Sequence, residues 1–288
     1  MASDGDRAAL VTGGASGLGL IVVEHLLQHQ WNVTIFDFDA TAGKREATRL
    51  GERVLFIQGD VTDYQSQARA FRDTFEKWGR IDLVFANAGI SEREEFAPPA
   101  AQPEATESTT PDTSVIDVCL VGVIYSAKLA LQYFRKRPSS YGRLVVTSSQ
   151  AGIYSSDTHP LYSAAKFGAV AFVRGLSKRL RKSGENITAN VICPGLVDTP
   201  MTAGPFIDNA PAEMIVPPSL VVQVIQSFLD DESITGQAVE ISGSELIYRT
   251  DPEYANAAAE YVLGGGYSKD TSPEDLIKFS QRSAQPRA

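Results

Sequence analysis

The sequence has few of the residues that build disulfides, metal sites or membrane spans. Its 288 residues include only two cysteines, Cys119 and Cys193, and three histidines. Both cysteines stand in apolar runs without a CxxC or Cys–His spacing, which favours buried reduced thiols over a disulfide or a metal site. No run reaches the roughly 18 apolar residues of a membrane span, and the polar N-terminus MASDGDR lacks the apolar core of a signal peptide. We therefore expect a soluble, cytoplasmic protein with no metal and no membrane span.

An excess of positive charge is also missing. The formal net charge is −9 and the pI is near 4.9. A nucleic-acid-binding surface is normally basic, so nucleic acid is not an expected partner. The 43% hydrophobic content is enough for one large core. The net charge says little about the substrate, because it does not locate a charged patch.

Short apolar runs alternate with helical patterns along most of the chain. Most of the runs are apolar or β-branched throughout, as expected for strands that are covered on both faces. The expected strands are residues 8–12, 32–37, 53–60, 81–87, 143–149, 187–193 and 237–242. The expected helices are residues 17–30, 65–78, 115–134, 161–182 and 218–229. This alternation predicts an α/β, Rossmann-type, doubly wound sheet of seven parallel strands flanked by helices.

Three regions depart from the alternation. Residues 91–114 are acidic and rich in proline and threonine, which is typical of a surface loop. Residues 196–218 combine prolines with scattered apolar side chains, and we refer to them as the flap. Residues 244–288 follow the last expected strand and contain a weak helical pattern at 252–263 and another helix start at Ser272. We expect a catalytic domain over residues 1–243 and a C-terminal extension over 244–288, packed on the core or on a neighbouring subunit.

A glycine-rich turn, TGGASGLG, follows the first expected strand at residues 12–19 and opens a helix. Glycines allow a sharp turn and a close approach of the backbone to a pyrophosphate, and the helix N-terminus offers free N–H groups to that anion. A glycine turn alone is weak evidence, but its position between a strand and a helix favours a dinucleotide site. The residues expected to border the phosphates are Gly13, Ser16, Gly17, Leu18 and Gly19.

Asp37 ends the second expected strand, where a carboxylate can accept hydrogen bonds from a ribose diol. It would repel the 2′-phosphate of NADP, and Phe38 follows it rather than a basic residue. NAD is therefore favoured over NADP, although a solvated or helix-capping aspartate is an alternative interpretation. Polar or small residues at the ends of the third and fourth strands are further cofactor-binding candidates, although each is also common in ordinary turns: Asp60, Val61, Asn87, Ala88 and Gly89.

Tyr162 and Lys166 are four residues apart in LYSAAKFGAV, and Ser149 precedes them in VVTSSQAG. Positions i and i+4 of a helix share one face, so the phenol and the ammonium group point at one spot. With a hydroxyl from another segment, they can move a proton on and off an alcohol oxygen. The alternative is an exposed helix pair with no catalytic role.

Taken together, these motifs resemble the short-chain dehydrogenase/reductase family over residues 7–243. TGGASGLG is similar to that family's TGxxxGxG turn, ANAG (86–89) to its NNAG segment, and CPGLVDTP (193–200) to its PG motif. Ser149, Tyr162 and Lys166 match its catalytic serine and YxxxK pair. Within the family the chain is most similar to NAD-dependent 15-hydroxyprostaglandin dehydrogenase-like members, mainly because of Asp37.

The resemblance implies roles for the matched residues. Tyr162 would be the general acid/base, Lys166 would favour its ionised form and bind the nicotinamide ribose, and Ser149 would hold the substrate oxygen. Three residues after the sixth strand would border the nicotinamide: Pro194, Val197 and Thr199. The apolar helix at 115–134 and the helix of Tyr162 would be subunit surfaces of a homodimer or homotetramer.

One position departs from the family pattern. Family members carry an asparagine within a segment like VNLxGV, which helps to organise a proton-conducting water chain. This chain reads DVCLVGV, with Cys119 at that position. Cysteine keeps the backbone carbonyl but loses the amide, so the relay could survive, slow down or be lost.

The sequence leads to a main functional hypothesis and two alternatives. The main hypothesis is NAD-dependent oxidation of a secondary alcohol on a mid-sized apolar substrate such as a steroid, terpenoid, polyketide or fatty-acid-like molecule, in specialised metabolism. The alternatives are an NADPH-dependent ketone reductase and a nucleotide-binding family member whose redox activity is weakened by Cys119. Candidate substrate contacts, besides Ser149, are His159, Met201 and Phe206.

Overall fold

The computed structural model describes residues 7–96, 110–137 and 141–264. The chain divides into two compact units, Met1–Arg249 and Thr250–Ala288. Within the second unit, the described residues form a single short helix, α9 (Ala257–Leu263), which begins with Asn256 as its cap. All the other elements belong to the first unit.

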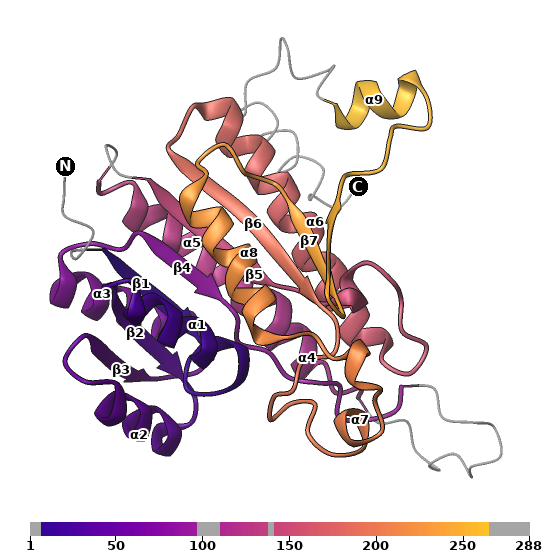
Figure 1. The fold of residues 1–288 in the computed structure, drawn as a ribbon. Coiled ribbons are helices and arrows are strands. Elements are labelled where there is room, and N and C mark those ends of the chain that lie inside the picture. Colours follow the sequence, from indigo (N-terminus) through magenta and orange to yellow (C-terminus); the bar gives the residue numbers. More distant parts are fainter. Residues whose placement is uncertain (1–6, 97–109, 138–140, 265–288) are drawn as a thin grey trace. The chain divides into compact units, whose positions relative to one another are not determined.

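The first unit is built around one sheet (Figure 1) with the strand order β3-β2-β1-β4-β5-β6-β7-β8. The strands are β1 (Ala8–Thr12), β2 (Asn32–Asp37), β3 (Val54–Gln58), β4 (Leu83–Ala86), β5 (Gly142–Thr147), β6 (Ile187–Pro194), β7 (Ala238–Ser242) and β8 (Glu245–Arg249). Every neighbouring pair is parallel except β7 and β8. The order in which successive strands are added reverses between β1 and β4, so the carboxyl ends of these two parallel strands flank a crevice where nucleotides bind in such folds.

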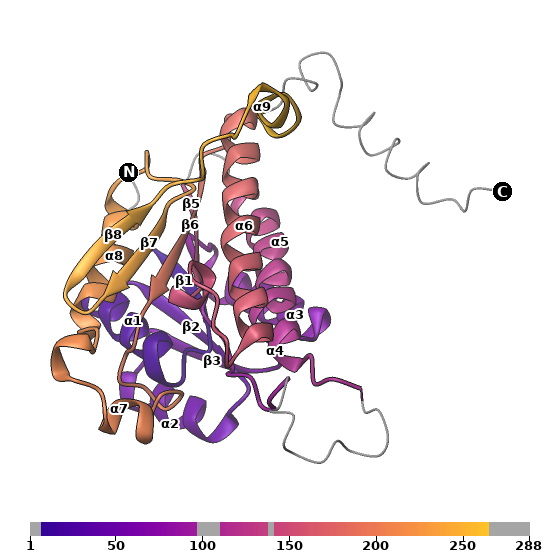
Figure 2. The same cartoon turned by 90° about the vertical axis from the view of Figure 1, so that its right-hand side faces the viewer.

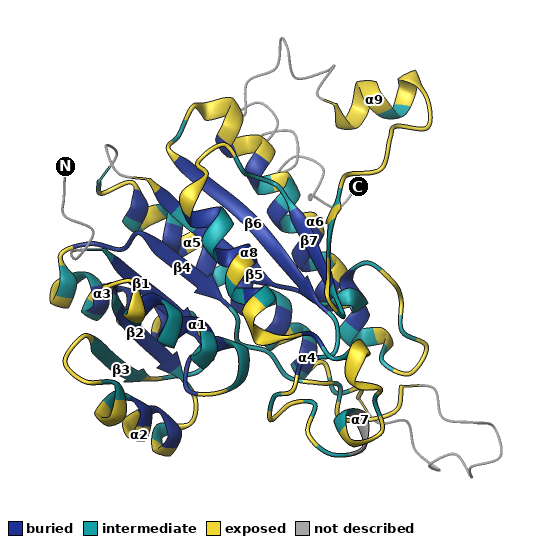
Figure 3. Ribbon diagram, viewed as in Figure 1, coloured by how far each residue is buried: buried dark blue, intermediate teal, exposed yellow. Residues whose placement is uncertain are grey.

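Helices cover both faces of the sheet, as Figure 2 shows. On one face α1 (Gly17–Gln28), α2 (Ala40–Leu50) and α8 (Pro218–Asp230) pack on alternate strand residues such as Val11 and Ile35. On the other face α3 (Tyr64–Trp78), α5 (Gly122–Phe134) and α6 (Pro160–Ser183) pack on the intervening residues such as Leu10 and Val84. The central strands are buried on both sides (Figure 3), which explains their continuous apolar sequences, whereas the edge strands β3 and β8 are partly exposed. The predicted doubly wound fold is confirmed.

The structure adds an eighth strand to the seven that were expected. Gly243, with φ at +51°, turns the chain so that β8 pairs antiparallel with β7. The predicted domain boundary at 243/244 therefore falls in the middle of a hairpin.

Helix α2 was not expected, because residues 40–50 have no large apolar stripe. Its buried face consists of Ala42, Gly43 and Glu46, and a side chain at Gly43 would collide with the ring of Phe56. The carboxylate of Asp39 caps the helix by accepting hydrogen bonds from the amides of residues 41 and 42. Close backbone packing and a cap, rather than apolar periodicity, define this helix.

The predicted helix at 115–134 is interrupted by a π-helical turn. Ser114–Ile116 forms α4, Asp117–Val121 is the π-turn, and α5 follows directly. Among the described residues, two helical stretches are by length and composition alone apolar enough to cross a membrane: Ser114–Phe134 and Ala212–Asp230. Both contribute side chains to the core beside the sheet, which accounts for their apolar character.

Short helices also occur in the flap, with α7 at Pro205–Asp208 and a 3-10 turn at Ala212–Met214. The helix expected to start at Ser272 lies outside the described residues.

Candidate active site

A pocket of about 830 Å³ lies at the carboxyl ends of the central strands. It gathers segments that are far apart in the sequence, from the glycine turn to the flap. The predicted site residues that line it are Gly13, Ser16, Gly17, Leu18, Asp37, Phe38, Asp60, Val61, Asn87, Ala88, Gly89, Ser149, His159, Tyr162, Lys166, Pro194, Val197, Thr199 and Met201. Gly19 is not among the lining residues, and the side chain of Phe206 in α7 is outside the described part of the structure.

The glycine turn requires glycine for two different reasons. Gly13 has φ at +64°, and a Cβ there would lie 2.9 Å from the Cα of Ala88. At Gly19 a Cβ would lie 2.0 Å from the carbonyl oxygen of Gly13, so this glycine allows α1 to pack on the turn rather than lining the pocket. The turn is therefore a compact backbone loop with its surface open to a ligand.

The N-terminus of α1 differs from those of α2 and α3. Asp39 and Asp63 cap α2 and α3 through their side chains, whereas Ser16 at the start of α1 makes no side-chain cap. An uncapped helix N-terminus presents backbone N–H groups and a partial positive charge to an anion. This end of α1 fits a pyrophosphate.

Asp37 is held by backbone amides on both sides. Its Oδ2 accepts a hydrogen bond from Ala15 N at 2.9 Å, and its Oδ1 accepts one from Asp39 N at 3.0 Å. Each carboxylate oxygen has a second lone pair, so the oriented carboxylate can still accept hydrogen bonds from a ribose diol.

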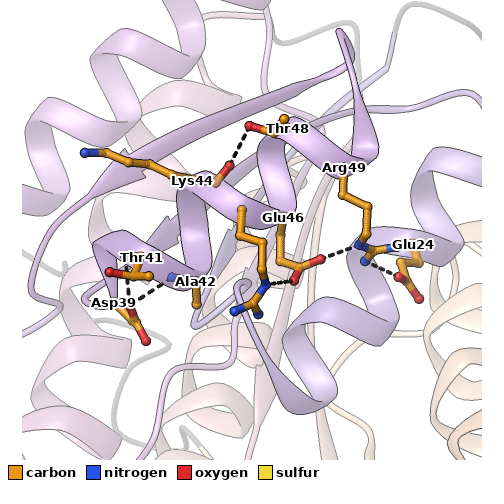
Figure 4. A network of polar contacts seen from close by, with 9 residues as sticks. Glu24, Asp39, Thr41, Ala42, Lys44, Glu46, Thr48 and Arg49 are labelled. Atoms are coloured by element: carbon orange, nitrogen blue, oxygen red, sulfur yellow. Dashed lines mark hydrogen bonds and ion pairs between the residues drawn. The ribbon is translucent and has the colours of Figure 1, made fainter.

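Two arginines of α2 are ion-paired with glutamates (Figure 4). Arg45 and Arg49 both contact Glu46, and Arg49 also contacts Glu24. Hydrogen bonds from Arg49 and Arg45 hold the pKa of Glu46 below its usual value. Glu46 and Glu24 therefore engage both guanidinium groups.

Asn87 ties three strand ends together. Its amide nitrogen donates to Thr12 O at 3.1 Å, and its Oδ1 accepts from Thr147 Oγ1 at 3.0 Å. The Thr12 hydroxyl in turn accepts hydrogen bonds from the amides of Asn87 and Ala88. Asn87 therefore shapes the floor of the pocket.

Tyr162 and Lys166 converge in the pocket. The Lys166 Nζ lies 5.4 Å from the centre of the Tyr162 ring and donates a hydrogen bond to Thr147 O at 2.9 Å. Burial alone lowers the pKa of Lys166, but Cys119, Tyr162 and Cys193 raise it, and the pKa lies above its usual value. The side chain is thus a buried cation at neutral pH, next to a phenol.

Ser149 starts the 3-10 turn Gln150–Gly152, and its Oγ accepts a hydrogen bond from Ala151 N at 3.1 Å. The neighbouring Ser148 donates from its Oγ to Lys166 O at 2.9 Å, which fastens the serine segment to α6. A hydroxyl, a phenol and an ammonium group therefore line one pocket, and such a set can hold an alcohol oxygen and exchange its proton.

Glu92 is a residue that the sequence analysis missed. Its Oε2 accepts a hydrogen bond from the backbone N–H of Tyr162 at 3.0 Å, so it caps α6 at the tyrosine itself. His159, which directly precedes the first residue of α6, provides no side-chain cap. No local pattern marks Glu92, because the contact joins segments 70 residues apart.

Cys119 lies in the π-turn and contacts the chain after β4. Its Sγ is 3.4 Å from both the amide nitrogen and the carbonyl oxygen of Ile90. A thiol is a weak donor and a weak acceptor, so the sulfur can meet both backbone groups. Burial raises the pKa of the other thiol, Cys193, to about 12, which keeps it neutral and unreactive.

The predicted substrate residues lie on less regular structure. The Nδ1 of His159 is hydrogen-bonded to Thr158 Oγ1 at 2.8 Å, at the pocket wall. Met201 is 50% exposed in the flap, which begins with a hydrogen-bonded turn between Thr199 and Thr202. These side chains form the open side of the pocket.

Comparison with known proteins places this site in a family. Residues 7–209 match the short chain dehydrogenase family. The chain is 34% identical over 270 residues to the short-chain dehydrogenase/reductase prx7 of Penicillium rubens, covering 85% of this chain and 95% of that protein. It is 30% identical over 268 residues to the mouse (Mus musculus) 15-hydroxyprostaglandin dehydrogenase [NAD(+)], covering 85% and 94%.

A solved structure agrees with the fold. The 3-ketoacyl-(acyl-carrier-protein) reductase from Brucella melitensis, complexed with NADH, matches with a TM-score of 0.71 at 21% identity, covering 83% of this chain and 97% of that one. The chain belongs to the short-chain dehydrogenase/reductase family. It is an oxidoreductase that acts on CH–OH groups and has the nucleotide-binding fold of that family.

Proposed function

We propose that this protein oxidises a secondary alcohol to a ketone with NAD, using Tyr162 as the general base. The observation that carries the proposal is the position of the Lys166 ammonium, 5.4 Å from the Tyr162 ring within the pocket that Ser149 also lines. The ammonium favours the ionised phenol, which accepts the proton of the alcohol. The Ser149 hydroxyl holds the substrate oxygen during this transfer. When bound, the cofactor supplies the hydride acceptor.

The choice of NAD rests on the charge around Asp37. A carboxylate fixed by two amides disfavours a 2′-phosphate, and Arg45 and Arg49 of α2 are engaged by glutamates. Phe38, the next residue along the chain, is 74% exposed and carries no charge. The naming of several relatives as NAD(+)-dependent 15-hydroxyprostaglandin dehydrogenases supports the same choice.

We further propose a mid-sized apolar substrate. Apolar flap side chains, including Met201 at the pocket, suit such a molecule. Several mammalian relatives are named 15-hydroxyprostaglandin dehydrogenases, and a hydroxylated compound of that kind is one candidate substrate. Action in the cytoplasm as a homodimer or homotetramer, with a role in specialised metabolism, completes the proposal.

The test follows NADH absorbance with NAD and a panel of steroid, terpenoid, polyketide and hydroxylated fatty-acid alcohols. We expect turnover with at least one class, and a loss of about 10²–10⁴-fold in kcat for Tyr162→Phe, because a general base is removed. The variant should bind NAD with the affinity of the parent. Absence of turnover with every class, in a protein that binds NAD, would contradict the proposal.

Two further measurements separate the proposal from an NADPH-dependent ketone reductase. Titration of the protein with NAD and with NADP compares the two affinities directly. Tighter binding of NADP would overturn the role given to Asp37, and faster reduction of the matching ketones with NADPH would favour the reductase.

A further inference from the structure

A buried carboxylate on β7 contacts the segment that carries Ser149. Glu240 on β7 is 2% exposed. Its Oε1 accepts a hydrogen bond from Gln150 Nε2 at 2.8 Å, and its Oε2 accepts one from Arg249 Nε at 2.7 Å. The hydroxyl of Tyr154 also donates to Oε2, at 3.3 Å. Both oxygens of a charged group therefore have partners, as burial requires.

These partners hold the serine segment at both of its ends. Gln150 directly follows Ser149, and Tyr154 lies just beyond the 3-10 turn that Ser149 starts. Gln150 Nε2 also donates to Ser242 Oγ at 2.9 Å, and Tyr154 OH also contacts the Arg249 guanidinium. Residues 149–154 are thus fastened to β7 and β8 by side-chain contacts about 90 residues apart in the sequence.

Gln150 also contacts the segment after β6. A Cβ at Gly195 would lie 2.7 Å from the Gln150 Oε1, so a side chain at this position would displace the Gln150 amide. Gly195 follows Pro194, and both line the pocket. The Gln150 amide therefore sits between the Glu240 carboxylate on one side and a pocket wall on the other.

Arg249 links strand β8 both to Glu240 and to helix α6. It is the final residue of β8, and its carbonyl oxygen accepts a hydrogen bond from Arg174 of α6, the helix that carries Tyr162 and Lys166. Glu240 and Arg249 are paired across the hairpin with the carboxylate almost fully buried and the guanidinium about one-third exposed. Removing the cation would leave an uncompensated buried charge, which is more disruptive than losing both groups together.

We propose that Glu240 and Arg249 are positioning residues for the catalytic serine, acting through Gln150 and Tyr154, and that β8 is consequently required for catalysis. The inference rests on the proposed role of Ser149. A serine that shifts by a fraction of an ångström would no longer hold the substrate oxygen where the phenol and the hydride acceptor meet.

The experiment compares Arg249→Met, Arg249→Lys and the double variant Glu240→Gln/Arg249→Met with the parent. Amide hydrogen exchange of residues 149–156 reports on the segment without any substrate, and kcat and KM for NAD report on catalysis. We expect Arg249→Met to raise exchange in this segment about tenfold and to lower kcat about tenfold or more, with KM for NAD nearly unchanged. Arg249→Lys should recover part of kcat, because it restores the charge.

The double variant keeps the proposal testable if Arg249→Met fails to fold, because it leaves no unpaired buried charge. It should fold and still show faster exchange at 149–156 and a lower kcat. The matched control is Arg135→Met, which breaks the bidentate Arg135–Glu185 pair on the surface and should change neither quantity.

Parent-like exchange and parent-like kcat in the double variant would overturn the proposal, as would an equal loss in Arg135→Met. A parent that turns over no alcohol would count against the proposed function instead. In that case the exchange data alone decide whether Glu240 and Arg249 hold the serine segment.

Discussion

The two sides of the pocket are built differently. The nucleotide side consists of strand ends and a glycine turn, in which Asp37 and Asn87 are each fixed by two or more hydrogen bonds. The substrate side consists of loops and the flap, where Met201 and Met214 are half exposed or more. Side chains at the strand ends bind the ligand that members of a fold share. Loop side chains differ between members of one fold and determine the individual ligand. The nucleotide side therefore identifies the family, and the substrate side determines the particular alcohol.

Lys166 belongs to both sides of the pocket. It is anchored to Thr147 at the end of β5 and lies against Tyr162. We expect Lys166→Met to lower kcat by about 10²–10³-fold, since the cation that favours the ionised phenol is lost.

Steady-state initial rates of the parent and of the variant, measured with the same alcohol and NAD, check this prediction. The control is Lys182→Met, which removes an exposed lysine from the same helix. An equal fall in kcat in Lys182→Met would mean that the loss does not depend on the cation beside Tyr162.

A change at Asp37 should affect the nucleotide side alone. Asp37→Asn removes the charge but keeps an acceptor oxygen, and a hydrogen bond to a charged group is worth about 1.5–3 kcal/mol. We expect KM for NAD to rise about 10–100-fold and the discrimination against NADP to shrink, with kcat at saturation nearly unchanged. Steady-state kinetics with both cofactors measures this.

Asp39→Asn is the matched control for Asp37→Asn. It neutralises a carboxylate two residues away, and asparagine can still cap α2. Equal changes in the two variants would indicate a general charge effect on the loop. No change in cofactor preference for Asp37→Asn would remove the reason for choosing NAD.

The residues on the nucleotide side can be picked out of the sequence because their signals are local. A continuous apolar strand, a glycine turn and an i, i+4 pair are each contained within a few residues. The contacts that hold Ser149 and Tyr162 are not local. Glu92 reaches α6 over 70 residues, and Glu240 reaches Gln150 over 90. No periodicity or spacing in the chain links such pairs.

Two elements were missed for related reasons. Helix α2 buries glycine, alanine and an ion-paired glutamate, so it has no apolar stripe to detect. Strand β8 is short and its residues are partly exposed, and it is defined by pairing with β7 after a turn at Gly243. Both elements depend on a tertiary partner, which overrides weak local preference.

The smallest effect is expected at Cys119, where the chain departs from the family pattern. The thiol already contacts the N–H and the C=O of Ile90 at 3.4 Å each, the two backbone groups that an amide side chain would also meet. The sulfur therefore holds the π-turn against the segment after β4, and the Cys119 carbonyl stays in place. We expect Cys119→Asn to change kcat by less than about threefold and Cys119→Ala to cost about 1 kcal/mol of stability, since two weak hydrogen bonds are lost and a small cavity forms.

Thermal unfolding and kcat of both variants test this, with Cys193→Ala as the control for a cavity at the other buried cysteine. If the thiol instead weakened the proton relay, Cys119→Asn would raise kcat more than about tenfold, because the amide would restore the usual arrangement. That result would assign the protein to the nucleotide-binding members with reduced redox activity. Parent-like turnover in Cys119→Asn, together with a loss of stability in Cys119→Ala, would show that the cysteine is a structural substitute for the asparagine.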